Sequence, residues 1–197
     1  MAYAKRTLLN LQQDIADKHD SGVLPTDSPT LAYWTRLLNN AQQYIADRLR
    51  LITNTDLTTV SGTIALPDDF VEIKDVVYEN TYLSRISKED SEGASGLVYW
   101  ITGDQTNGFY LNTTDDQTYT VYYKFNPAPM VNNTDVCVIP DPLAVSVYAY
   151  AKLRQAETDP LEDANQSLGE AEARIAEMIS VNKANEGSLS FSMMQNG

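Results

Sequence analysis

The chain has 197 residues, 43% of them hydrophobic, and carries a formal net charge of −13. This size allows one sizeable core, so a single domain, or one domain with a large insertion, is expected. No segment approaches the ~18 consecutive apolar residues of a membrane helix, and charges interrupt the N-terminal region before the ~7-residue apolar core of a signal peptide develops. We therefore expect a soluble protein that is not exported through a cleaved signal.

The negative charge is unevenly distributed along the chain. Residues 1–50 contain six Lys/Arg and five Asp/Glu, residues 51–140 contain four and thirteen, and residues 141–197 contain four and nine. An acidic surface repels phosphate backbones and lacks the basic stripe that gripping DNA or RNA requires. Tight nucleic-acid binding is therefore disfavoured, although weak repulsion would suit a channel through which DNA slides.

Two helices are predicted in the N-terminal region. The first runs from about Ala4 to Lys18, with apolar residues at helical spacing. The second begins with Ser28 as its N-cap and Pro29 in the first helical position. Its apolar residues form one stripe: Leu31, Trp34, Leu38, Ala41, Ile45 and Leu49.

A region rich in strands follows, because the hydrophobic period changes to two and Thr, Val and Tyr become frequent. Its clearest strand is Thr118–Phe125. The aspartate pairs Asp68-Asp69 and Asp115-Asp116 are expected to form turns. The other predicted strands are Thr63–Leu66, Phe70–Tyr78, Tyr82–Ser87, a hairpin of Leu97–Thr102 with Phe109–Leu111, and a short strand at Val136–Ile139.

The helical period returns after residue 140. Asp141 followed by proline opens a helix of roughly Leu143–Thr158, and Asp159 followed by proline opens another. Gly169 within the last helix favours a close contact with a neighbouring helix. The apolar side of this helix carries Leu161, Ala164, Leu168, Ala171, Ile175 and Met178.

The fold class expected from this order is α+β. Residues 1–50 and 141–186 supply the helices of a bundle, and residues 51–140 form a central, inserted, antiparallel β-sheet region. Residues 187–197 form a flexible or arm-like tail. Its apolar residues Leu189, Phe191, Met193 and Met194 have no evident use within the chain, so it is either a frayed terminus or an arm that becomes ordered against a neighbouring subunit.

The sequence offers no constellation for catalysis. His19 is the only histidine and lies at a helix end, where a cation complements the helix dipole. Cys137 lies in an apolar run and is expected to be a small buried hydrophobe, without an intrachain disulfide. One Cys and one His cannot build a structural zinc site, and no glycine-rich phosphate loop is present. We predict no catalytic, cofactor-binding or metal-binding residues, although a distant carboxylate pair for glycoside hydrolysis stays open.

Tyrosine is concentrated in the predicted sheet region. Most of these rings are expected to pack on a half-buried sheet, but tyrosine is also favoured at protein interfaces and on sugar-binding faces. The residues are Tyr78, Tyr82, Tyr99, Tyr110, Tyr119, Tyr122 and Tyr123.

Residues 5–183 resemble the head-to-tail connector (adaptor) proteins of tailed bacteriophages. The likeness is carried by a helix that contains Trp34 and an Asn40-Ala41 pair, by a strand start at residues 66–70 with the sequence Leu-Pro-Asp-Asp-Phe, and by C-terminal helices that open with proline. The resemblance implies a homo-oligomeric ring, commonly dodecameric, docked beneath the portal protein and bound to tail or neck proteins. It implies a place at the head-tail junction of the virion after synthesis in the host cytoplasm, with double-stranded DNA passing through the bore without specific binding and no membrane.

Two other functions remain open at the level of sequence. The tyrosine-rich sheet would also fit another neck or tail-completion protein, such as a stopper or tail terminator. A virion-associated glycan hydrolase that relies on carboxylates is the remote alternative.

Overall fold

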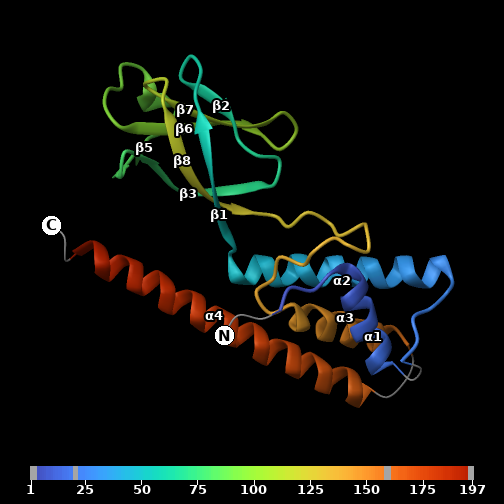
Figure 1. Ribbon diagram of the computed structural model, residues 1–197. Helices are drawn as coiled ribbons and strands as arrows, with labels where there is room; N and C mark the ends of the chain where they lie inside the picture. The colour runs from blue at the N-terminus through green and yellow to red at the C-terminus, as the bar shows by residue number, and fades with distance from the viewer. Residues whose placement is uncertain (1–3, 20–21, 158–160, 195–197) are drawn as a thin grey trace. The chain divides into compact units, whose positions relative to one another are not determined.

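The computed structural model describes residues 4–19, 22–157 and 161–194, with the backbone alone at residue 161 and residues 183–194. The chain forms two compact units, drawn in Figure 1. Met1–Leu49 and Pro127–Gly197 make up the helical unit, and Arg50–Asn126 make up the sheet unit. The α+β class expected from the sequence is confirmed, whereas the sheet unit ends well before residue 140.

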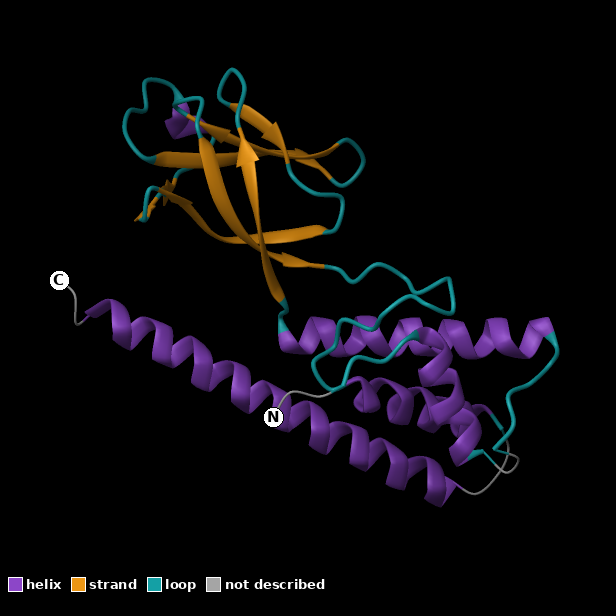
Figure 2. Ribbon diagram, in the orientation of Figure 1, coloured by secondary structure: helices purple, strands orange, loops and turns teal. Residues whose placement is uncertain are grey.

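The described part of the helical unit contains four α-helices, shown in purple in Figure 2. Helix α3 contacts the other three helices and is therefore the central element of this unit. Apolar residues at helical spacing on all four helices make its core, which includes Leu11, Ile15, Leu38, Ile45, Val145, Ala149 and Ile175, all with no exposed surface. The helices are α1 (Leu8–Lys18), α2 (Ser28–Leu49), α3 (Pro142–Ala156) and α4 (Leu161–Met194).

The first two helices begin at positions that differ from the prediction. Helix α1 begins at Leu8 and not near Ala4, because the Thr7 side chain caps it. Asp27, and not Ser28, caps α2: its Oδ1 accepts a hydrogen bond from the Thr30 N–H at 2.9 Å. Hydrogen bonds from Thr30, first from its side chain and then from its backbone N–H, lower the pKa of the Asp27 carboxyl. Several capping residues stand close together in this stretch, and the aspartate is the one whose side chain reaches the free amide.

The two C-terminal helices match the prediction in part. Asp141 caps α3 by accepting from the Leu143 N–H at 3.2 Å, as predicted. The predicted cap of the last helix, Asp159, lies outside the described residues. Gly169 makes no close helix contact, since it is exposed and a Cβ added there would meet no atom within 4 Å. The helical backbone of α4 also continues to Met194, through residues for which the sequence shows no helical period.

The sheet unit contains two four-stranded sheets. In the first the strand order is β1-β8-β3-β4, and in the second it is β2-β7-β6-β5. All pairs are antiparallel except β5 with β6, which is parallel, so the expectation of a purely antiparallel region was wrong at that pair. The strands are β1 (Ile52–Thr58), β2 (Thr63–Ala65), β3 (Phe70–Tyr78), β4 (Thr81–Tyr82), β5 (Ser84–Arg85), β6 (Val98–Asp104), β7 (Gly108–Thr113) and β8 (Thr118–Phe125).

Strand β8 organises the sheet unit. Its bounds are those predicted from its alternating pattern, and it pairs with β1 on one side and β3 on the other. The predicted strand over residues 82–87 is instead two short strands, β4 and β5, which belong to different sheets. Alternate residues of both sheets form the core, which contains Ile73, Val76, Tyr99, Leu111, Tyr119, Val121 and Tyr123.

An extended segment, residues 127–141, links the end of the sheet unit to α3 and belongs to the helical unit. The strand predicted over residues 136–139 does not form. Val136 makes a single antiparallel bridge with Thr7, through hydrogen bonds from Leu8 N–H to the Asp135 carbonyl and from Cys137 N–H to the Arg6 carbonyl. The alternating burial of this segment therefore reflects one bridge and the helices beneath it, and no sheet.

Candidate assembly site

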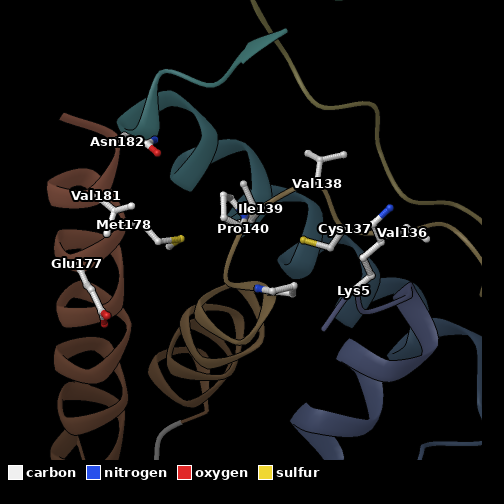
Figure 3. A pocket seen from close by; sticks show the side chains of 11 residues that line it. Lys5, Val136, Cys137, Val138, Ile139, Pro140, Glu177, Met178, Val181 and Asn182 are labelled. Carbon is white, nitrogen blue, oxygen red and sulfur yellow. The ribbon is translucent and has the colours of Figure 1, made fainter. Parts of the chain in front are cut away.

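A pocket of about 690 Å³ opens on the helical unit (Figure 3). The extended segment forms one wall with Val136, Val138 and neighbouring residues, and helix α4 forms the other with residues 177–182. The side chains of Cys137 and Met178 point into the space between the walls. The two charged residues at the pocket are Lys5 and Glu177.

Two polar residues of α2 hold the extended segment in place. The Asn39 side chain donates to the Met130 carbonyl at 3.0 Å and accepts from the Met130 N–H at 2.8 Å. Gln42, which is buried, donates to the Ala128 carbonyl at 3.2 Å and accepts from the Val138 N–H at 3.3 Å. Each amide side chain satisfies a backbone donor and a backbone acceptor that no sheet partner serves. The pocket wall is therefore anchored without strand pairing.

Asp141 fixes the distance between the extended segment and α4. Its side chain is 2% exposed and accepts from Arg174 on α4 at 2.9 Å. Its backbone N–H donates to the Met178 sulfur at 3.3 Å. The same carboxylate caps α3, so one buried charge joins the start of α3 to the middle of α4. Both walls of the pocket depend on this arrangement.

A second polar cluster joins α2 to α4 near their exposed faces. The Tyr44 hydroxyl donates to Glu172 at 2.9 Å and accepts from Arg48 at 3.0 Å, and Arg48 also pairs with Glu172. Tyr44 stacks on Tyr148 of α3 with ring centroids 4.7 Å apart. Three helices are therefore linked by one set of aromatic and charged side chains.

Cys137 is 4% exposed, so the prediction of a small buried residue is confirmed. Burial raises the pKa of its thiol to about 11. A thiol with so high a pKa carries little thiolate near neutral pH and is a poor nucleophile.

His19 lies at the C-cap of α1, where its backbone N–H donates to the Ile15 carbonyl at 2.9 Å. Its Nε2 lies 3.3 Å from an oxygen of Glu157, which also pairs with Arg154 at 3.2 Å. The ring lies 6.2 Å from that of Trp34, beside a second cavity of about 610 Å³. His19 thus lies at a helix end with its ring beside a carboxylate.

Asp68-Asp69 form a turn, as predicted, whereas Asp115-Asp116 lie in a bend and the loop between β7 and β8. Asp116 accepts from the backbone N–H groups of Ser61 and Gly62 at 3.0 and 2.6 Å and so fastens the turn after β1. Asp69 accepts from the Tyr123 hydroxyl at 3.1 Å in the turn before β3. Across the described ranges, no group of three or more His, Cys, Asp or Glu side chains is placed to hold a metal ion.

The seven tyrosines of the sheet unit differ in burial, with Tyr78 and Tyr122 half-buried. Tyr99, Tyr119 and Tyr123 are buried in the core, in agreement with packing on a sheet. Tyr82 and Tyr110 are exposed, at 48% and 37%.

The residues that build the pocket lie in three segments far apart in the sequence, and sequence reasoning did not find them as a site. The alternation of Val136, Cys137, Val138 and Ile139 was recognised, but it was interpreted as a strand. The roles of Asn39, Gln42 and Arg174 depend on partners that only the fold brings near. In the sequence these three residues stand out only as polar residues beside the apolar positions of a helix, which is a weak signal for a structural role.

The chain matches the model of the SU10 adaptor protein family over residues 6–192. Because this match spans nearly the whole chain, the chain belongs to the SU10 adaptor protein family. A comparison with curated proteins gave no match.

Membership places the protein at the head-tail junction of a bacteriophage particle, in association with portal and tail proteins. Among the described helices, none is both long enough and apolar enough to cross a membrane.

Proposed function

We propose that copies of this chain assemble into a ring beneath the portal and join the capsid to the tail while DNA passes through the bore. The family match over residues 6–192 carries this proposal. In it, α1–α4 form a bundle that packs between neighbours in the ring. A ring of twelve copies is the number that the resemblance of the sequence implies.

The charge of the sheet unit supports the passage of DNA. Residues 50–126 contain twelve Asp/Glu and five Lys/Arg. A ring that presented such a surface to its bore would repel the phosphate backbone and let DNA slide without adhering. We expect retention of duplex DNA on the purified protein to be negligible at physiological salt, measured by gel shift.

Electron microscopy of the purified full chain, alone and mixed with its portal, tests the ring. The expected result is ring-shaped particles, either free or seated on the portal. Some adaptors assemble only on their partner, so a monomeric free protein does not contradict the proposal. A protein that stays monomeric and also fails to bind the portal would overturn it.

A second candidate is another neck or tail-completion protein, favoured by the exposed rings of Tyr82 and Tyr110 on the sheet unit. Localisation in the particle separates the two functions. A layer in contact with the portal supports the adaptor, whereas a layer that does not touch the portal supports the stopper or tail terminator.

We further propose that the protein has no catalytic activity and needs no cofactor or metal. The buried Cys137 thiol is a poor nucleophile, and the His19 ring lies 3.3 Å from a Glu157 oxygen at a helix end, which supports this view. A zymogram on peptidoglycan tests the remaining glycan hydrolase alternative. Clearing that a single Asp or Glu substitution abolishes would contradict the proposal.

A further inference from the structure

The pocket on the helical unit is apolar and open. Val136, Val138 and Val181 stand around it with exposures of 44%, 46% and 52%. Three exposed valines around one pocket form an apolar patch, and exposed apolar patches of this kind mark interaction sites. The next question is which molecule or segment occupies the pocket.

Helix α4 supplies a candidate occupant. Among its described side chains, the last buried one is that of Met178, yet the helical backbone continues to Met194. Residues 187–192 read Gly-Ser-Leu-Ser-Phe-Ser, which is a poor helix former. Most helices in proteins are stable because an apolar face packs on another surface. We therefore expect the end of α4 to pack against another surface.

The composition of this end suits burial. Leu189, Phe191, Met193 and Met194 are apolar, and after Lys183 the only charged residue is Glu186. We call residues 189–194 the apolar end of α4. Its residues are apolar or contain sulfur, and so are the valines and the sulfur-containing side chains that line the pocket.

The apolar end cannot reach the pocket of its own chain. Val181 lines the pocket, and a helix rises 1.5 Å per residue, so Leu189 lies about 12 Å farther along the axis. Figure 2 shows α4 running on past α3 as one continuous helix. Within one copy, the pocket and the apolar end therefore lie apart along α4. A contact between them requires a second molecule.

We propose that the pocket lined by Val136, Val138 and Val181 receives the apolar end of α4 from a second copy of this chain. Such a contact is heterologous, because one surface patch meets a different patch on the neighbour. Heterologous contacts repeated with a closing rotation generate a ring. The inference rests on the ring of the proposed function and identifies the surfaces that would hold it together.

Substitutions on each side of the contact, made in the full chain, test the proposal. Val138→Asp puts a carboxylate in the pocket wall, and Phe191→Asp puts one in the apolar end. Each is expected to raise the protein concentration needed for half assembly by about tenfold or more, because a charge must be buried on contact. Val131→Asp and Ser180→Asp are the matched controls, since Val131 is 74% exposed, Ser180 is an exposed residue of α4, and neither lines the pocket or belongs to the apolar end.

Assembly is followed by light scattering and electron microscopy, in the presence of the portal if the free chain stays monomeric. Far-UV circular dichroism checks that each variant is folded. Rings from the controls but not from the two test variants support the proposal. Rings from both test variants at wild-type concentrations overturn it and leave the proposed ring intact.

A cross-link identifies the occupant directly. A photo-reactive residue in place of Phe191 is placed in one isotopically labelled copy and mixed with unlabelled chain and portal. We expect cross-links from the labelled copy to residues 136–142 or 177–182 of the unlabelled copy. Cross-links to the portal alone, or within one chain alone, overturn the copy-to-copy contact. If the wild-type chain forms no ring even with the portal, the proposed function itself fails.

Discussion

The helical unit and the sheet unit are stabilised by different kinds of interaction. In the helical unit, buried polar groups join one element to another across long stretches of sequence, as Asp141 does with Arg174 and Asn39 with Met130. In the sheet unit, apolar side chains of both sheets form the core, and polar side chains join neighbouring strands, as Asn112 does with Thr63, or fasten turns, as Asp116 does. The helical unit therefore relies on specific polar links between distant segments, and the sheet unit relies on the packing of its own core.

The largest expected effect, and the most direct test of whether the two units differ, comes from weakening the core of each unit separately. Leu38 and Leu111 are fully buried, one in each unit, and replacing either by alanine should cost about 2–5 kcal/mol. If the units unfold independently, Leu38→Ala lowers only the transition of the helices and Leu111→Ala only that of the strands. Calorimetry with amide exchange measures both. A single shared transition that both variants lower equally would contradict two separate units.

The link between α3 and α4 should give the next largest effect. Arg174→Met leaves the Asp141 carboxylate buried without its cation, at a cost of about 1–3 kcal/mol in unfolding free energy. Because Asp141 also holds the pocket walls, ring assembly should weaken as well. Urea unfolding measures the first effect and light scattering the second. Arg36→Met, on the exposed face of α2, is the control; it loses only the contact of the guanidinium with the Tyr33 ring, 5.1 Å away, and should change stability by less than about 1 kcal/mol.

A matched pair of tyrosines sharpens the comparison further. Tyr44→Phe removes the hydroxyl between Glu172 and Arg48 but keeps the ring stacked on Tyr148. Tyr123→Phe removes the hydroxyl that donates to Asp69 in the sheet unit. Each should cost about 0.5–1.5 kcal/mol. Amide exchange should speed up in α4 for the first variant and in the turn before β3 for the second; the reverse pattern would argue against local links.

Mild acid should have the smallest effect, and it should act on both units. Backbone N–H donors, first Asn132 for Asp135 and Asn107 for Asp104, lower the pKa of both carboxyls. A lowered pKa stabilises the fold at pH values above the ordinary aspartate pKa of about 3.9, and this stabilisation is lost as the pH falls through the folded value. Protection of the Asn132 and Asn107 amides, relative to their intrinsic exchange rate at each pH, should therefore fall below about pH 4. Asp135→Asn and Asp104→Asn should flatten this dependence, each at its own turn.

Local signals were sufficient to predict much of the fold. Strand β8 was found because its alternation runs uninterrupted, and the start of α3 because Asp141 and the following proline have one favoured role at a helix N-terminus. The same reasoning failed where two neighbouring residues were equally suited, as with Asp27 and Ser28. It also failed at Gly169, because composition does not reveal which side of a helix faces solvent.

The pocket could not be predicted in this way. The bridge between Thr7 and Val136 joins distant parts of the chain, and it gives the extended segment the alternation of a strand without a sheet. The lining residues of α4 lie around and after Met178, where the apolar side predicted for this helix ends. Only the fold brings these pieces to one place.

The sheet unit begins and ends on one pair of strands. Ile52 pairs with Lys124, so the chain enters and leaves through neighbouring positions of β1 and β8. A unit with adjacent ends behaves as a cassette, because its replacement by a larger, smaller or unrelated module requires no rerouting of the remaining chain. Evolution can therefore diversify this part of the protein, and engineers can graft onto it, while the helices keep their own contacts.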